Sequence, residues 1–215
     1  MYTRQQEFLE FAYVSGALKF GQFVLNSGRT SPYFLNTGNF SNGADLMKLS
    51  GFYADTIAQQ FSSEFMLYGP AYKGIPLAAA TAVSLNYNHN RSVPFAFDRK
   101  EAKDHGELGW IVGAPLTGDV VIVEDVITSG HSVEKAVDII QKQGAHPMAV
   151  VISLDRMEKC VDSEQSAVQQ VQERYDVDVL SVATFNDLLE FVDNMRELND
   201  TSNLLKAYGK QFVVD

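Results

Sequence analysis

The sequence predicts an α/β fold, in which a doubly wound and mainly parallel sheet is flanked by helices. Short apolar runs rich in Val, Ile, Phe and Leu alternate along the chain with segments whose apolar residues recur at helical spacing. The clearest run, residues 120–123, is apolar at every position, which is typical of a strand covered on both faces. Strands that alternate with helices form parallel βαβ units, and such sheets bind ligands outside the carboxyl ends of their strands.

The first part of the chain predicts two helices separated by a hairpin. Residues 5–17 place Phe, Leu and Ala at helical spacing, which indicates an amphipathic helix. Residues 23–25 and 33–35 are expected as short strands on either side of a glycine-containing turn at 27–29. Residues 44–61 repeat the helical pattern, with their larger apolar residues on one face.

The remainder predicts the strands and helices of the sheet. Pro76 suits the first turn of one helix, and Gly144 suits the end of another. The expected strands are residues 65–68, 93–97, 120–123, 149–154 and 177–182. The expected helices are residues 75–85, 133–143, 185–195 and 203–208, and the polar residues 99–109 are expected to form a loop.

Composition and charge indicate one globular domain, residues 1–215, of which 46% are hydrophobic and 20% are charged. No apolar run approaches the roughly 20 residues of a membrane span, and the first residues lack the pattern of a secretory signal. The single Cys160 cannot form an internal disulfide, which favours a reducing cytoplasm. It could be a nucleophile, but acidic neighbours would raise its thiol pKa. The net charge of −10 argues against nucleic acid and requires any anion site to be local.

Two carboxylates, Glu124 and Asp125, follow the clearest strand directly. Residues 126–132 then lead into a helix, so backbone N–H groups and the helix N-terminus could cradle a phosphate. Carboxylates repel phosphate but accept hydrogen bonds from sugar hydroxyls. The combination therefore predicts a ribose 5′-phosphate site, against the alternative of a capped helix with solvated acids. The expected cradle residues are Val126, Ile127, Thr128, Ser129, Gly130, His131 and Ser132.

Other phosphate and metal motifs do not fit. GPAYKGIP, residues 69–76, has the glycine spacing of a P-loop, but Ile75 stands where that motif needs lysine. The chain has no G-x-G-x-x-G, H-E-x-x-H or C-x-x-C, so we expect neither a dinucleotide fold nor a metal cage made by the protein alone.

A cationic loop at residues 98–109 is the second cluster. A solvated surface loop is the plain interpretation, but long loops without apolar anchors are often functional lids. Closure over a diphosphate would satisfy the charges, and Lys73, in the turn after an earlier strand, adds a fifth cation unless it is an ordinary turn lysine. The loop cations are Arg99, Lys100, Lys103 and His105.

These motifs together resemble a known family. VVIVEDVITSG, residues 120–130, is similar to the ribose-phosphate signature of the type I phosphoribosyltransferases. RKEAKDHGE resembles the mobile catalytic loop, residues 99–109, of members that act on orotate, as do LKFGQFVLNSGRTSPYF, GPAYKGIPLA and ISLDR in the same order. The resemblance implies synthesis of orotidine 5′-monophosphate and pyrophosphate from orotate and phosphoribosyl pyrophosphate (PRPP), with Mg²⁺, in de novo pyrimidine synthesis.

The resemblance also implies an assembly and a set of PRPP-binding residues. It implies a small hood made of about residues 1–40 with part of the C-terminal region, and a homodimer whose loop reaches into the partner's site. Glu124 and Asp125 would hold the ribose, residues 126–132 the 5′-phosphate, and Tyr72 and Lys73 the pyrophosphate. The partner's loop would add Arg99, Lys100, Lys103 and His105. Mg²⁺ would be held mainly by PRPP, with Asp125 acting through water. The implied catalytic residues are Lys100, Lys103, His105 and Asp125.

For orotate, the resemblance implies a cover formed by Phe34 and Leu35, with Thr128 nearby and Arg156 on the carboxylate. From the residues alone, Arg156 could equally form a structural ion pair with Asp155. The chain departs from the family at Leu35 and at Asn26, where an aromatic residue and a PRPP-binding Lys are usual.

Further departures are Glu124 for Asp and Trp110 for a small residue. Two other functions stay open, a phosphoribosyltransferase for another base and a non-catalytic PRPP sensor that binds nucleic acid. Arg156 and residues 27–34 favour orotate, while the charge and the lysine loop favour an enzyme.

Overall fold

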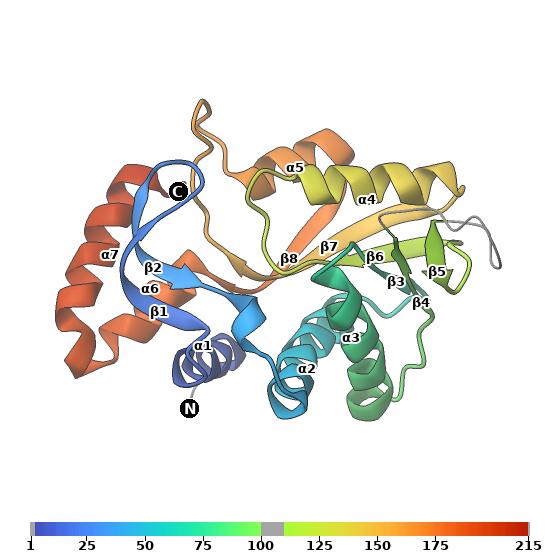
Figure 1. Ribbon diagram of the computed structural model, residues 1–215, viewed down its shortest axis with the longest axis horizontal. Helices are drawn as coiled ribbons and strands as arrows, with labels where there is room; N and C mark the ends of the chain where they lie inside the picture. The colour runs from blue at the N-terminus through green and yellow to red at the C-terminus, as the bar shows by residue number, and fades with distance from the viewer. Residues whose placement is uncertain (1–2, 100–109, 215) are drawn as a thin grey trace.

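A six-stranded sheet runs through the centre of the molecule, in the order β5-β4-β3-β6-β7-β8 (Figure 1). The computed structural model describes residues 3–99 and 110–214. All neighbouring strands of this sheet are parallel except the β4–β5 pair. The strands are β3 (Met66–Gly69), β4 (Phe95–Asp98), β5 (Ile111–Gly113), β6 (Asp119–Val123), β7 (His146–Asp155) and β8 (Asp178–Thr184). The predicted doubly wound, mainly parallel sheet is confirmed.

Helices cover both faces of the sheet, with α2 and α3 on one side and α4 and α5 on the other (Figure 1). β6 lies between these layers, and its apolar run alternates between them. Val121 and Val123 belong to one core cluster, while Val120 and Ile122 belong to the other. All four side chains are fully buried, as expected for a strand covered on both faces. The helices are α1 (Arg4–Val14), α2 (Gly43–Gln60), α3 (Gly74–His89), α4 (His131–Lys142), α5 (Ala167–Tyr175), α6 (Phe185–Asp193) and α7 (Asn199–Phe212).

A separate antiparallel hairpin, β1 (Leu18–Val24) and β2 (Thr30–Leu35), lies beside the sheet with α1, α6 and α7 (Figure 1). The helices α6 and α7 pack on it, since Tyr33 of β2 is in ring contact with Phe185 of α6 and Tyr208 of α7. A short 3-10 turn, η1 (Thr37–Asn39), joins the hairpin to α2, and a second, η2 (Arg196–Leu198), joins α6 to α7. The Thr37 hydroxyl of η1 donates to Asp125 just after β6, so the end of the hairpin lies at the carboxyl end of β6.

The structure differs from the sequence prediction at several element ends. The first helix was expected to reach residue 17, but it ends at Val14, because Gly16 adopts a left-handed φ of 73° and turns the chain into β1. The edge strand β5 and helix α5 were not predicted. α5 is short, yet it carries a capping box in which Ser166 and Gln169 satisfy each other's backbone N–H groups. No helix in the described ranges is both long and apolar enough to cross a membrane.

Candidate active site

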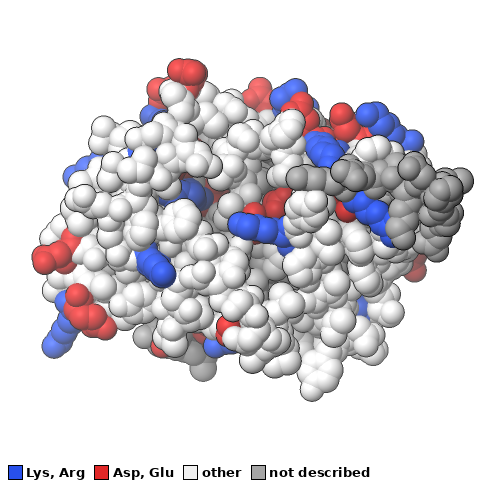
Figure 2. Space-filling view, viewed as in Figure 1, with Lys and Arg blue, Asp and Glu red and all other residues white. Residues whose placement is uncertain are grey.

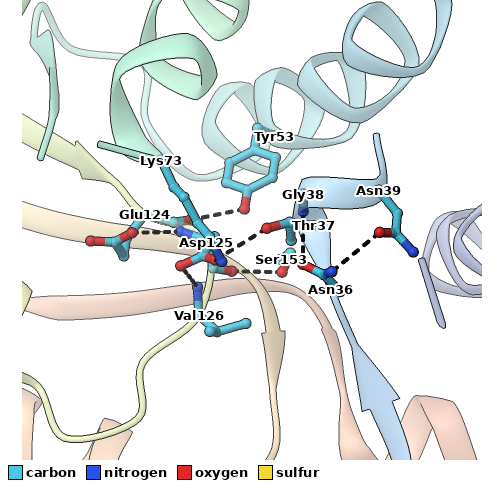
Figure 3. Close-up of polar contacts among 10 residues, drawn as sticks. All are labelled: Asn36, Thr37, Gly38, Asn39, Tyr53, Lys73, Glu124, Asp125, Val126 and Ser153. Carbon is cyan, nitrogen blue, oxygen red and sulfur yellow. Dashed lines mark hydrogen bonds and ion pairs between the residues drawn. The ribbon is translucent and has the colours of Figure 1, made fainter. Parts of the chain in front are cut away.

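Glu124 and Asp125 lie at the carboxyl end of β6, as predicted, and neighbouring elements hold their backbone (Figure 3). Ser153 of β7 donates to the Asp125 carbonyl from its N–H at 2.9 Å and from its hydroxyl at 2.6 Å. Tyr53 of α2 donates its hydroxyl to the Glu124 carbonyl at 2.9 Å. Both acids are buried, with 5% of the surface of Glu124 and 7% of that of Asp125 exposed. Their main-chain position is therefore set by the sheet and by α2.

The Asp125 carboxylate accepts three hydrogen bonds from three different segments. Its Oδ2 atom accepts from the Lys73 ammonium at 2.7 Å and from the Thr37 hydroxyl at 3.1 Å. Its Oδ1 atom accepts from the backbone N–H of Val126 at 2.8 Å. One carboxylate thus joins the turn after β3, the turn after β2 and the loop after β6 (Figure 3). Lys73 was expected as a cation near the strand ends, and the structure places it on Asp125. The contact from Thr37 was not predicted.

Glu124 lies in a different electrostatic environment. Its Oε1 atom accepts from the backbone N–H of Asp125 at 3.0 Å. Burial raises the pKa of Glu124 from 4.5 to about 7; the Asp125 N–H bond opposes this rise, and the Asp125 charge adds to it. From the sequence, Glu124 is expected to be a replacement for the family's usual aspartate that keeps the charge. In the folded chain it is instead an acid that titrates near neutrality.

Residues 126–130 form the loop that leads from β6 into α4. Gly130 is the N-cap of α4 with φ 72°, and no side chain of the described residues caps this helix. A Cβ at Gly130 would lie 3.0 Å from Val171 Cγ2, so α5 packs closely behind the loop. Thr128 and Ser129 are exposed, whereas Ile127 is buried in the core. The predicted cradle therefore exposes Thr128 and Ser129 beside the helix N-terminus, while Ile127 anchors it.

Tyr72 and Lys73 lie in the turn between β3 and α3 and are largely exposed. A buried carboxylate, Asp98 at the end of β4, supports this turn. It accepts from the Ala71 N–H at 2.8 Å and from the Lys135 ammonium of α4 at 2.7 Å. The sequence did not predict this role, because the contacts of Asp98 come from residues far away in the chain.

Of the predicted loop cations, Arg99 is described, and its N–H donates to the Trp110 carbonyl at 2.8 Å. Lys100, Lys103 and His105 lie outside the described residues. Acidic and basic side chains meet in a hollow near the middle of the face that Figure 2 shows, surrounded by mostly uncharged surface.

The predicted orotate residues do not all share one face. Phe34 is 40% exposed and stacks on Phe23, with ring centroids 5.6 Å apart. Leu35 is buried in the core, because successive residues of a strand point to opposite sides.

Asn26, at the position of the family's PRPP-binding Lys, is exposed in the turn of the hairpin.

Arg156 forms an ion pair with Glu158 and not with Asp155. Its Nε and Nη2 atoms donate to Glu158 Oε1 at 3.0 and 2.5 Å, and Nη2 also donates to the Ser31 hydroxyl at 3.0 Å. Its guanidinium lies 4.1 Å above the centre of the Tyr33 ring. Asp155 instead accepts from the Met157 N–H at 2.8 Å. The guanidinium is therefore held rigidly between Glu158, the Ser31 hydroxyl and the Tyr33 ring.

Comparison with known proteins identifies the family. The model of the phosphoribosyl transferase domain matches residues 38–184. The orotate phosphoribosyltransferase of Thioalkalivibrio sulfidiphilus is 50% identical over 214 residues, and the match covers both chains in full. The crystal structure of the orotate phosphoribosyltransferase of Francisella tularensis is 38% identical, with a TM-score of 0.87, and the match covers 96% of this chain and 99% of that one.

A more distant match shows the fold alone. It is the Mycobacterium tuberculosis orotate phosphoribosyltransferase in complex with PRPP, at 20% identity and a TM-score of 0.63 over 86% of this chain and 99% of that one. The family model covers the sheet and its acid pair, and the two more similar relatives extend the match through the hairpin and the C-terminal helices. The chain therefore belongs to the orotate phosphoribosyltransferases, pentosyltransferases of pyrimidine biosynthesis within the phosphoribosyltransferase family.

Proposed function

We propose that the site at the end of β6 transfers the phosphoribosyl group of PRPP to orotate, releasing pyrophosphate, with Mg²⁺ as the metal. The observation that carries this assignment is the buried Asp125, paired with Lys73 and placed directly before the uncapped N-terminus of α4. A ribose 5′-phosphate needs an acceptor for its hydroxyls and donors for its phosphate at this spacing. A relative of the same fold has been solved with PRPP bound.

In this mechanism each segment binds one part of PRPP. Asp125 and Glu124 accept the ribose hydroxyls, and the N–H groups of residues 126–132 bind the 5′-phosphate. Tyr72 and Lys73 bind the pyrophosphate, which draws the Lys73 ammonium away from Asp125. As the bond between ribose and pyrophosphate breaks, positive charge develops on the sugar and negative charge on the leaving group. Carboxylates beneath the sugar and a cation beside the leaving group stabilise both charges.

Orotate binds on the hairpin side of the site. Phe34 offers an exposed aromatic face, and the Arg156 guanidinium, a planar fork of N–H donors, binds the orotate carboxylate. The Glu158 and Tyr33 contacts fix the plane of the guanidinium before orotate arrives. The orotate ring nitrogen is already acidic, so the site positions orotate and does not need to activate it.

The acid pair also fits a metal that is shared with the substrate. Among the described residues, no group of three or more His, Cys, Asp or Glu side chains could hold a metal ion. Mg²⁺ usually keeps several waters and binds through one or two carboxylates together with substrate phosphates. Asp125 would therefore contact the ion through water while PRPP supplies most of its ligands. When bound, the ion would neutralise charge on the departing pyrophosphate.

The catalytic loop completes the site from a second copy of the chain. Arg99 follows β4 directly, and Lys100, Lys103 and His105 continue from it, so a loop that closes from the partner subunit would bring four cations to the pyrophosphate. Closure would also exclude water, which would otherwise hydrolyse the activated sugar.

An orotate absorbance assay with PRPP tests the function. We expect turnover with orotate, loss of activity with a chelator, recovery with Mg²⁺, and no turnover with adenine, guanine or hypoxanthine. Asp125→Asn should lower kcat/KM for PRPP strongly, because an amide is a weaker acceptor for ribose hydroxyls. No turnover of orotate at micromolar enzyme would contradict the proposal, and turnover of a purine base alone would reassign the substrate.

A further inference from the structure

Thr37, in the η1 turn that follows the hairpin, is one of the three donors to the Asp125 carboxylate. Its hydroxyl donates to Asp125 Oδ2 at 3.1 Å, across 88 positions of sequence. The side chain is buried, and Figure 3 shows it reaching from the end of the hairpin toward the acid. The same oxygen accepts from Lys73 at 2.7 Å. Thr37 therefore touches the group proposed to bind ribose without belonging to any predicted motif.

The 3-10 turn that carries Thr37 is held in place by several hydrogen bonds. The Asn36 side chain accepts from the Gly38 N–H at 3.1 Å and donates to Asn39 Oδ1 at 3.1 Å. Asn39 in turn donates to the Gly16 carbonyl at 2.7 Å, and the Asn36 N–H donates to the Ala17 carbonyl at 2.9 Å. These bonds fix η1 against the corner between α1 and β1. The Thr37 hydroxyl is thus presented from a rigid support.

Lys73 and Thr37 differ in what they can do when a substrate binds. The Lys73 side chain is 59% exposed, and its ammonium can leave Asp125 for a pyrophosphate. The Thr37 hydroxyl is neutral and buried, so a diphosphate does not attract it in the same way. A carboxylate offers about four lone-pair sites, and three are used in this structure. When Lys73 leaves, one more site becomes free, so about two are open to ribose hydroxyls, provided that the carboxylate keeps its orientation.

We propose that Thr37 is a positioning residue that keeps the Asp125 carboxylate oriented for the ribose while Lys73 exchanges to the pyrophosphate. The inference rests on the proposed role of Asp125 as the ribose acceptor. It also links the two substrates, because Phe34, the proposed orotate cover, lies three positions before Thr37 on the same segment. The segment from Phe34 to Thr37 then positions both orotate and the Asp125 carboxylate that binds the ribose.

Serine and alanine at position 37 isolate the hydroxyl, because the two variants differ only in that group. Thr37→Ala and the nearly isosteric Thr37→Val should lower kcat/KM for PRPP about tenfold, as expected for losing a hydrogen bond to a charged group. Thr37→Ser should stay within about twofold of wild type, and the orotate KM should hardly move in any of the three. Thr56→Val is the matched control, since the Thr56 hydroxyl donates to the Phe52 carbonyl within α2, away from the acid pair. Equal kcat/KM values for the Ser and Ala variants would overturn the inference.

The Asp125→Ala background separates this inference from the proposed function. There, calorimetry should show that Thr37→Val changes the PRPP Kd by less than about twofold, because the acceptor is gone. A further tenfold loss in that background would show that Thr37 acts without Asp125 and would contradict the inference. Wild-type kcat/KM for PRPP in Asp125→Ala itself would contradict the proposed function. If kcat/KM for PRPP fell in Asp125→Ala but stayed at the wild-type value in Thr37→Ala, only the role of Thr37 would be refuted.

Discussion

The charge of Glu124 should make the stability of the fold depend on pH. Burial raises the pKa of Glu124 from 4.5 to about 7. Below pH 4.5 the residue is neutral in both the folded and the unfolded chain. Between these values the folded state holds a proton that the unfolded state has lost, so the folding free energy becomes less favourable as pH rises. One pKa unit corresponds to about 1.4 kcal/mol, so ionised Glu124 destabilises the fold by roughly 3 kcal/mol above pH 7.

Glu124→Gln removes this dependence while keeping a side-chain oxygen that can accept from the Asp125 N–H. We expect Glu124→Gln to match wild type near pH 4.5 and to gain up to about 3 kcal/mol over it by pH 8. Urea unfolding at pH 5, 6, 7 and 8 measures the difference between the two proteins, in which other titrating groups largely cancel. Glu10→Gln, at an exposed position on α1, is the control. A difference between Glu124→Gln and wild type that is constant across the pH range would refute the reasoning.

Three further predictions concern the substrates and the assembly. Arg156→Ala should raise the orotate KM about tenfold and leave PRPP binding nearly intact; loss of PRPP affinity in calorimetry would show that the carboxylate assignment is wrong. Lys103→Ala and Asp125→Ala should each be nearly inactive, but after random subunit exchange their mixture should recover about a quarter of wild-type activity; no recovery, with exchange confirmed by native mass spectrometry, would place the loop in its own subunit's site. Asn26→Lys should lower the PRPP KM about tenfold at low salt and by less at high salt, because Arg29 is held by the Lys159 and Cys160 carbonyls and is not free to replace the missing cation. An unchanged KM at both salt concentrations would show that no charge is missing.

The sheet and the acid pair could be predicted because their signals are local. The four apolar residues before Glu124 specify a strand covered on both faces, and the hydroxyl-rich segment after Asp125 specifies a loop entering a helix. Chain order alone then places both acids at the ligand-binding edge of a parallel sheet. α5 was missed because nine residues give only a short periodic pattern, although Ser166 and Gln169 were a readable start signal.

The contacts that orient the site could not be predicted, because they join distant segments. Thr37 meets Asp125 and Lys135 meets Asp98 only after the sheet has formed. The ion-pair partner of Arg156 could not be predicted either, although it lies only two residues away in the sequence. Successive residues of an extended chain point to opposite sides, so its neighbour Asp155 cannot share its surroundings, and Glu158 becomes its partner instead.

Adjacent acids in a sequence need not carry equal charge in the fold. Asp125 has an ammonium, a hydroxyl and an N–H on its carboxylate, whereas Glu124 has the Asp125 N–H and the Ser132 hydroxyl, no cation among the described residues, and a pKa near 7. Around neutral pH the pair therefore carries fewer than two negative charges before substrate binds, which reduces its repulsion of a polyanion such as PRPP. Ribose hydroxyls that donate to Glu124 would favour its ionised form. In the proposed mechanism its full charge would then develop only when the sugar lies above it, where positive charge forms.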